Sequence, residues 1–291
     1  MSEQPAAAGL RDVAPEPGVA KPDPILKVDG LKRHFGGLTA VDVDHLEIQR
    51  GTITALIGPN GAGKTTLFNL LTGFDSADAG SWSLDGRQLG RVPSHKVAQM
   101  GMVRTFQLTK ALSRLTVLDN MLLGATEQRG ERFLSALLPP TWREQEQANT
   151  ERAESLLARF NLLDKRDDYA GELSGGQRKL LEMARALMVE PELVMLDEPM
   201  AGVNPALVQS LLGHVTSLRD EGMSVIFVEH DMDVIMTISD WIVVLAEGKV
   251  IAEGTPAQVS EDPAVIEAYL GSDDGVVLEE PSDDPPGGGD A

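Results

Sequence analysis

A glycine-rich stretch between an apolar run and a helix-like pattern carries the strongest chemical signal in this chain. The preceding run, residues 53–57, is apolar and β-branched, as in a buried strand. The following pattern, from residue 67 onward, has apolar residues at helical spacing. The stretch itself consists of Gly58, Pro59, Asn60, Gly61, Ala62, Gly63, Lys64, Thr65 and Thr66.

The residue types in this stretch suit the binding of a nucleoside triphosphate. Glycines allow successive backbone N–H groups to face a phosphate, and the helix that follows adds the positive end of its dipole. Lys64 supplies a point charge for the β- and γ-phosphates, and the Thr65 hydroxyl can ligate Mg²⁺. We therefore expect ATP and Mg²⁺ as cofactors. The alternative is a glycine-rich turn that precedes a helix by chance. Such a turn would not explain why Lys64 and Thr65 stand at the positions that a phosphate-binding loop requires.

Two adjacent carboxylates about 130 residues later complete this chemistry. Four apolar residues, 193–196, run directly into Asp197 and Glu198. An acid at the carboxyl end of a buried strand lies where ligands bind in open α/β sheets. Asp197 can hold the Mg²⁺ shell, and Glu198 can orient or deprotonate the attacking water. Many strand ends carry acids, so this pair is informative only together with the phosphate loop.

A second glycine-lined helix start lies shortly before the acidic pair. Its serine is a good N-cap, and an apolar face follows at helical spacing. Local chemistry allows either an ordinary capped helix or a second phosphate-binding device that closes on a nucleotide held by another subunit. The residues concerned are Ser174, Gly175, Gly176 and Gln177, preceded by Leu173.

Composition and charge exclude several classes of function. The chain has 291 residues, a hydrophobic fraction of 42%, no cysteine and a formal net charge of −20. Zero cysteines exclude disulfides and thiolate metal sites, and the acidic balance argues against nucleic acid as a partner. No apolar run approaches the roughly 20 residues that a membrane-spanning helix needs, and the N-terminus does not resemble a secretory signal.

The chain divides into segments of different pattern. Residues 1–23 are rich in Ala, Pro and Gly, so we expect a disordered leader. Residues 24–271 form the folded domain, in which antiparallel strands and one strand–helix unit precede a helical insert at about residues 108–175. Alternating strands and helices then return. Residues 272–291 form an acidic, Pro/Gly-rich tail, which we expect to be disordered.

The pentapeptide Leu-Ser-Gly-Gly-Gln, with the phosphate loop before it and Val-Met-Leu-Asp-Glu-Pro after it, resembles the nucleotide-binding subunit of an ABC transporter. The resemblance covers about residues 25–271 and implies an α/β P-loop NTPase core with an antiparallel β subdomain and a helical subdomain. By position, Gln107 matches the family's glutamine loop, which links the metal site to the membrane partner. His230 matches the switch histidine that contacts the γ-phosphate, and Phe35 the aromatic that stacks on adenine.

Finer motifs resemble one branch of that family. Arg-Thr-Phe-Gln at residues 104–107, Ala-Gly-Val-Asn-Pro at 201–205 and the C-terminal pattern of residues 254–271 look like the ATPases of branched-chain amino-acid importers and their amide and urea relatives. The loop that crosses between subunits usually ends in aspartate, whereas Asn204 stands here. An amide keeps the hydrogen bonding but loses the charge.

The resemblance implies an ATPase at the cytoplasmic face of a membrane that works as a dimer with an identical or related subunit. Its further partners would be transmembrane permease subunits and, indirectly, a solute-binding protein. Two alternatives stay open: an ATPase of another ABC branch, such as lipid or lipopolysaccharide export, and a soluble ABC ATPase that acts on chromosomes or ribosomes. The latter is disfavoured because only about 110 residues separate Lys64 from Ser174, without sustained heptads.

Overall fold

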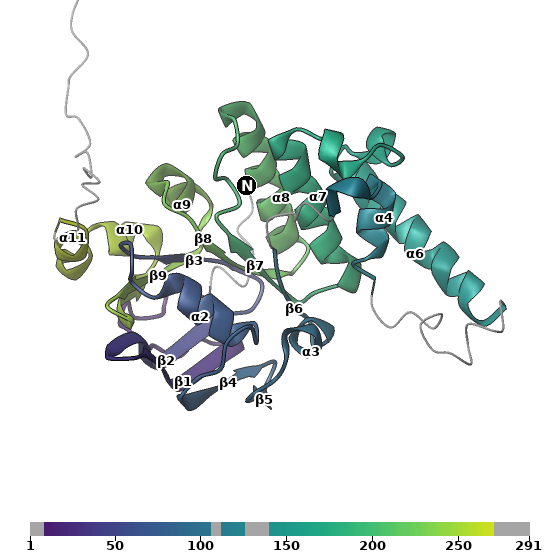
Figure 1. Cartoon of the computed structure of the whole chain (residues 1–291). Coiled ribbons are helices and arrows are strands. Elements are labelled where there is room, and N and C mark those ends of the chain that lie inside the picture. The colour runs from purple at the N-terminus through teal and green to yellow at the C-terminus, as the bar shows by residue number, and fades with distance from the viewer. Residues whose placement is uncertain (1–8, 106–111, 126–139, 271–291) are drawn as a thin grey trace, which may run out of the picture.

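The computed structural model of the chain describes residues 9–105, 112–125 and 140–270. Two β-sheets and a group of helices build the domain (Figure 1). The smaller sheet has the order β2-β1-β4-β5 and is antiparallel throughout. Its strands are β1 (Pro24–Phe35), β2 (Leu38–Gln49), β4 (Ala79–Leu84) and β5 (Arg87–Leu89).

The larger sheet has the order β10-β9-β3-β8-β7-β6. Its pairings are parallel except for β9 with β10, which form an antiparallel hairpin. Every residue of β3 and β8 is buried, including Thr54 and Ser224, so both central strands are covered on both faces. The strands are β3 (Ile53–Ile57), β6 (Met102–Arg104), β7 (Leu193–Asp197), β8 (Ser224–Val228), β9 (Trp241–Ala246) and β10 (Lys249–Gly254).

The larger sheet separates two hydrophobic clusters, as the period-2 alternation of strand side chains requires. On β7, Val194 and Leu196 join one cluster, while Leu193 and Met195 join the other. The first cluster includes residues of α7 (Gly175–Ala186), α8 (Pro205–Asp220) and α9 (Met232–Ile238). The second includes residues of the smaller sheet and of α2 (Lys64–Leu71), so the parallel sheet lies between two packed layers.

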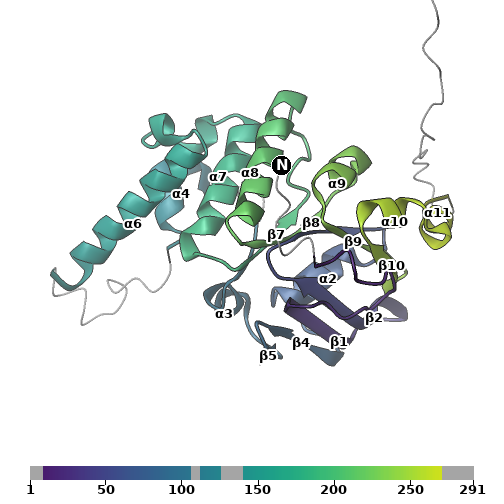
Figure 2. The same cartoon turned by 180° about the vertical axis from the view of Figure 1, so that it is seen from behind.

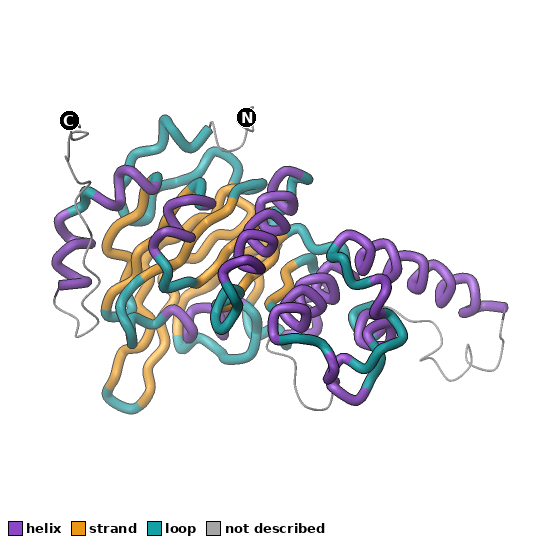
Figure 3. The backbone as a smooth tube through the Cα atoms, turned by 90° about the horizontal axis from the view of Figure 1, so that it is seen from above, coloured by secondary structure: helices purple, strands orange, loops and turns teal. Residues whose placement is uncertain are grey.

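The helical part lies at one end of the molecule. Helices α4 (Val117–Leu122) and α6 (Pro140–Arg159) pack with α7, and α6 projects away from the strands (Figures 1 and 3). At the opposite end lie α10 (Pro256–Ser260) and α11 (Pro263–Leu270), next to the β9–β10 hairpin (Figure 2). The short α3 (Ser94–Gln99) precedes β6. None of the helices described is long and apolar enough to cross a membrane.

Residues 9–23 correct the expectation of a disordered leader that extends to residue 23. Leu10 is 1% exposed and belongs to the second cluster. The Lys21 ammonium donates to Glu253 at 2.8 Å and lies 4.6 Å from the centre of the Trp241 ring. Low hydrophobicity predicts disorder, but Leu10, the partly buried Val13 and Val19, and the buried pair of Lys21 with Glu253 hold this segment on the folded domain. Residues 1–8 and the acidic tail, residues 271–291, lie outside the described chain.

Candidate nucleotide-binding site

The phosphate-binding loop follows β3 directly and ends where α2 begins at Lys64, as the sequence predicts. Gly58 and Gly63 have φ angles of 147° and 101°. A Cβ atom at Gly58 would lie 2.0 Å from the Leu245 carbonyl oxygen, and one at Gly63 would lie 2.2 Å from that of Ala40. Only glycine fits both positions, because neighbouring backbone fills the space that a side chain would need.

Lys64 is buried and its ammonium points back along the loop. It donates to the carbonyl oxygens of Gly58 at 2.5 Å and Pro59 at 3.0 Å. The positive charge is therefore held against the loop backbone, and the N-terminus of α2 begins at the same residue. Both features favour an anion at the same place.

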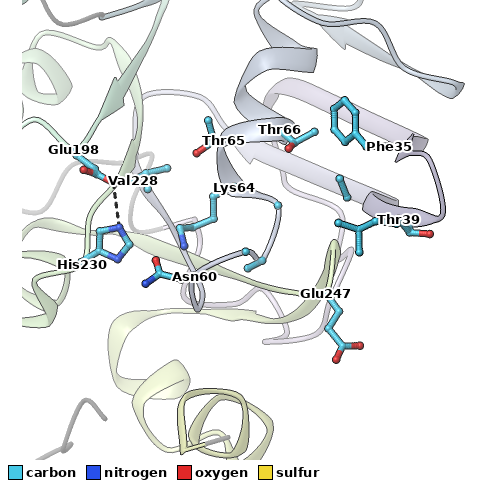
Figure 4. A pocket seen from close by; sticks show the side chains of 15 residues that line it. Phe35, Thr39, Asn60, Lys64, Thr65, Thr66, Glu198, Val228, His230 and Glu247 are labelled. Atoms are coloured by element: carbon cyan, nitrogen blue, oxygen red, sulfur yellow. Dashed lines mark hydrogen bonds and ion pairs between the residues drawn. The ribbon is translucent and has the colours of Figure 1, made fainter. Parts of the chain in front are cut away.

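A cavity of about 690 Å³ opens over this loop. Figure 4 shows Lys64 and Asn60 between Phe35 on one side and the pair Glu198 and His230 on the other. Phe35 is half exposed at the end of β1, and the Arg33 guanidinium lies over its ring, 4.7 Å from the centroid. The cavity thus places the predicted phosphate, base and hydrolysis residues around one space. It is lined by Phe35, residues 60–66, Glu198 and His230, together with Leu38, Thr39, Ala40, Val228 and Glu247.

Glu198 and His230 form the polar pair at one edge of the cavity. The Glu198 carboxylate lies 3.1 Å from His230 Nε2, and the two side chains are 47% and 51% exposed. The Glu198 backbone has a positive φ of 46°, and its N–H donates to the Val228 carbonyl of the neighbouring strand. Its carbonyl accepts from Lys179 at 3.1 Å. These contacts aim an accessible carboxylate at the cavity, as a general base requires.

Asp197 is the residue before Glu198, but it does not line the cavity. Its carboxylate accepts from Arg104 at 2.5 Å, and Arg104 also donates to Asn69 of α2 at 2.6 Å. The sequence places Arg104 in the Arg-Thr-Phe-Gln motif but does not indicate its pairing with Asp197, because the two residues are 93 positions apart. Asp197 and the Thr65 hydroxyl are oxygen donors of the kind that suits Mg²⁺. Gln107, the third predicted metal ligand, lies outside the described residues.

The start of α7 forms a complete capping box. Ser174 Oγ accepts from the Gln177 N–H at 3.2 Å, and the Ser174 N–H donates to the Gln177 side chain at 2.9 Å. None of residues 174–177 lines the cavity over the phosphate loop. Within one chain, therefore, these residues meet the local requirement of a helix N-terminus and do not reach the nucleotide site.

Asn204 is the N-cap of α8. Its side-chain oxygen accepts from the Leu207 N–H at 3.0 Å. Asparagine and aspartate serve about equally well at this position, so the replacement of the usual aspartate leaves the start of the helix intact.

Glu182 is a buried acid on α7 that the sequence did not single out. Burial raises the pKa of its carboxyl to about 7, nearby Asp197 acts in the same direction, and Lys179 and Arg185 oppose the shift. The folded chain therefore binds this proton more tightly than the unfolded chain does. The free energy of unfolding should fall as the pH rises from about 4.5 to about 7.

We expect Glu182→Gln to remove that pH dependence. At pH 8 the variant should be more stable than the wild type by about 1–3 kcal/mol, because no charge is buried, and at pH 5 the two should be similar. Urea denaturation at both pH values measures the difference. Glu146→Gln, at an exposed position on α6, is the matched control. Equal stability of Glu182→Gln and wild type at both pH values would contradict the prediction.

The fold and the cavity define a nucleotide-binding P-loop domain with a separate helical part. The family model described as ABC transporter matches residues 41–201, and the model described as branched-chain amino acid ATP-binding cassette transporter matches residues 249–275. The chain belongs to the ABC transporter family of ATP-binding proteins. Membership implies that it binds nucleotide and hydrolyses ATP.

Individual relatives agree with this assignment. The high-affinity branched-chain amino acid transport ATP-binding protein BraF of Pseudomonas aeruginosa is 42% identical over 250 residues, which are 85% of this chain and 98% of the relative. The protein LivG of Escherichia coli, also described as a high-affinity branched-chain amino acid transport ATP-binding protein, is 41% identical over 250 residues. These residues are 85% of this chain and 98% of the relative. A solved nucleotide-free ATP-binding cassette from an ABC transporter matches with a TM-score of 0.75 and 36% identity, over 84% of this chain and 98% of that one. The ADP conformation of another ATP-binding cassette of an ABC transporter matches with a TM-score of 0.75 and 37% identity. The match covers 86% of this chain and 99% of that one.

Proposed function

We propose that the chain is the ATP-hydrolysing subunit of an importer for branched-chain amino acids or related small polar solutes. The observation that carries the proposal is the cavity in which Lys64, Glu198 and His230 meet, in a chain whose reported relatives are named for branched-chain amino acid transport. These relatives favour an importer over lipid export and over a soluble, non-transport ATPase.

In this proposal the phosphate loop and Lys64 bind the triphosphate, and Phe35 stacks on the base. Glu198 accepts the proton of the attacking water, while His230 contacts the γ-phosphate and orients Glu198 through their 3.1 Å contact. When bound, Mg²⁺ neutralises charge on the β- and γ-phosphates, and Thr65, Asp197 and Gln107 are the residues that would hold it.

The start of α7 fits a role across a dimer. Ser174, Gly175 and Gln177 lie outside the cavity of their own chain and keep a glycine-lined helix N-terminus, which suits the γ-phosphate of a nucleotide on a second ATPase subunit. Closing two subunits on two ATP molecules would move transmembrane permease subunits, and a solute-binding protein would deliver the solute. The ATPase would then sit peripherally at the cytoplasmic face of the membrane.

Solute uptake tests the proposal in cells that lack the gene. We expect the wild-type gene to restore high-affinity uptake of labelled leucine, isoleucine and valine, or of urea and short amides, and Lys64→Ala to fail, because the phosphates lose their positive partner. Lys165→Ala, which removes an exposed lysine paired with Asp168, is the matched control and should restore uptake. Normal uptake of all these solutes in the deletion strain, together with a lipid-export defect, would contradict the proposal.

A further inference from the structure

We propose that Glu229 is a positioning residue for hydrolysis, whose buried carboxylate holds the loop that carries Glu198 in place beside His230. The inference rests on the role of Glu198 in the proposed function and is independent of the transported solute. Glu229 is 6% exposed and does not line the cavity over the phosphate loop. Any effect of Glu229 on the reaction must therefore pass through its neighbours.

The Glu229 carboxylate joins two segments that are far apart in the sequence. One oxygen accepts from the Met200 N–H at 2.7 Å, two residues after Glu198 in the chain. The other oxygen accepts from the N–H of His230, the residue that follows Glu229, at 3.3 Å. One buried side chain thus ties the backbone next to Glu198 to the backbone of the histidine that Glu198 contacts.

The turn at Glu198 depends on such restraints, because its φ of 46° is a conformation that glutamate rarely adopts. Residues in this region keep their conformation only where the surrounding structure holds them. The Glu198 N–H donates to the Val228 carbonyl at 3.0 Å, and the Glu198 carbonyl accepts from Lys179 at 3.1 Å. The bond from Met200 to Glu229 is the third restraint and, at 2.7 Å, the shortest of the three.

Glu229 borders a different space from the nucleotide site. Its neighbours Val228 and His230 line the cavity over the phosphate loop, whereas Glu229 lines a second cavity of about 580 Å³. Glu198 and His230 border both cavities. A change at Glu229 should therefore displace the hydrolysis pair and leave the phosphate loop in place. We expect kcat to fall without a matching loss of nucleotide affinity.

Glu229→Met and Glu229→Gln test the inference on the full chain. Methionine fills a similar volume without a strong acceptor, whereas the glutamine oxygen can still accept from the Met200 N–H. We expect Glu229→Met to lower kcat for Mg·ATP by roughly ten- to a hundredfold, because a displacement of about 1 Å in a catalytic site has effects of this order. The KM for Mg·ATP and the Kd for Mg·ADP, by isothermal titration calorimetry, should stay within about threefold of wild type. Glu229→Gln should keep kcat within about threefold.

A second background separates positioning from a merely structural role. In Glu198→Gln the positioned carboxylate is already lost, so adding Glu229→Met should change the remaining rate by less than about threefold. A general loss of folded protein would instead lower the rate equally in both backgrounds. Glu261→Met, at an exposed acid in the turn after α10, is the matched control and should change neither rate.

Glu229→Asp covers the case in which Glu229→Met does not fold. Aspartate keeps the charge, but its side chain is shorter by one methylene, so the carboxylate withdraws from the Met200 N–H. We expect kcat to fall in Glu229→Asp as in Glu229→Met, although the acid is retained. A lower rate with aspartate than with glutamine would show that reach, and not charge, is what the position requires.

Two sets of outcomes separate this inference from the proposed function. Wild-type kcat in the folded methionine or aspartate variant, or a glutamine variant as slow as the methionine one, would overturn the inference while the wild type still hydrolyses ATP. Equal losses from Glu229→Met in both backgrounds would overturn it as well. A wild-type chain that hydrolyses no ATP would overturn the proposed function and the inference with it.

Discussion

Glu198→Gln is expected to lower the rate of ATP hydrolysis by roughly a hundredfold to ten-thousandfold, the usual cost of a lost general base. Glutamine keeps the size and the hydrogen bonding of the side chain and removes the basic oxygen. The Glu198 carboxylate is 47% exposed at the edge of the cavity and lies 3.1 Å from His230 Nε2, so it can reach a water beside the γ-phosphate. Steady-state ATPase kinetics measure the loss.

Binding of ATP should survive in the same variant. Figure 4 shows Lys64 apart from Glu198 in the cavity, so the substitution leaves Lys64 and the phosphate loop in place. Binding without hydrolysis should trap a closed dimer, which size-exclusion chromatography with ATP detects. Lys64→Ala should instead weaken binding itself, so no ATP-dependent dimer accumulates.

Glu261→Gln provides the control, because it makes the same substitution at an exposed acid in the turn after α10. It should hydrolyse ATP at the wild-type rate and form no trapped dimer. Wild-type turnover by Glu198→Gln, or a folded Glu198→Gln that stays monomeric at saturating ATP, would show that the role assigned to Glu198 is wrong.

Glu253→Ala should lower the free energy of unfolding by about 3–5 kcal/mol, the cost of leaving a buried charge without its partner. The Glu253 side chain is 0% exposed and accepts from the Gly18 and Val19 N–H groups, the Lys21 ammonium and the Trp241 indole. Its loss leaves the Lys21 ammonium buried and releases the N-terminal segment from β10. Chemical denaturation of the full chain measures the change.

A double-mutant cycle isolates the ion pair from the other contacts of Glu253. The double variant Lys21→Met/Glu253→Ala should lose less free energy of unfolding than the two single variants lose in sum, because each single change already breaks the ion pair. Lys165→Met, whose partner is Asp168 in the helical part, is the matched control and should add independently to Glu253→Ala. If the free energy of unfolding of Glu253→Ala lay within about 0.5 kcal/mol of the wild-type value, the buried network would not stabilise the fold as predicted.

Local pattern was sufficient wherever the determinants of structure are neighbours in the chain. The predicted strands 53–57 and 193–196 coincide with β3 and with the first four residues of β7, because a short run of apolar and β-branched residues is typical of a buried central strand. The phosphate loop was equally predictable, since its glycines, Lys64 and Thr65 act within nine residues. The Ser174 cap also follows from a spacing of three residues.

Long-range pairs were not predictable in this way. Lys21 and Glu253 are 232 residues apart and Arg104 and Asp197 are 93 apart, and no periodicity links either pair. For the same reason the sequence alone predicts disorder for residues 9–23. This segment of low hydrophobicity is held by the buried Leu10, by two partly buried valines and by the paired charge of Lys21, whose partner Glu253 lies in β10.

The sequence by itself thus determined the chemistry of this protein: a triphosphate loop, an acidic pair at a strand end and a capped helix of the signature type. These follow from residue types at short spacing, where backbone geometry leaves few choices. Only the tertiary structure decided that Glu198 meets His230 and that Asp197 is paired with Arg104. Such contacts depend on how the sheets and helices pack, and packing brings together residues whose separation in the chain carries no signal.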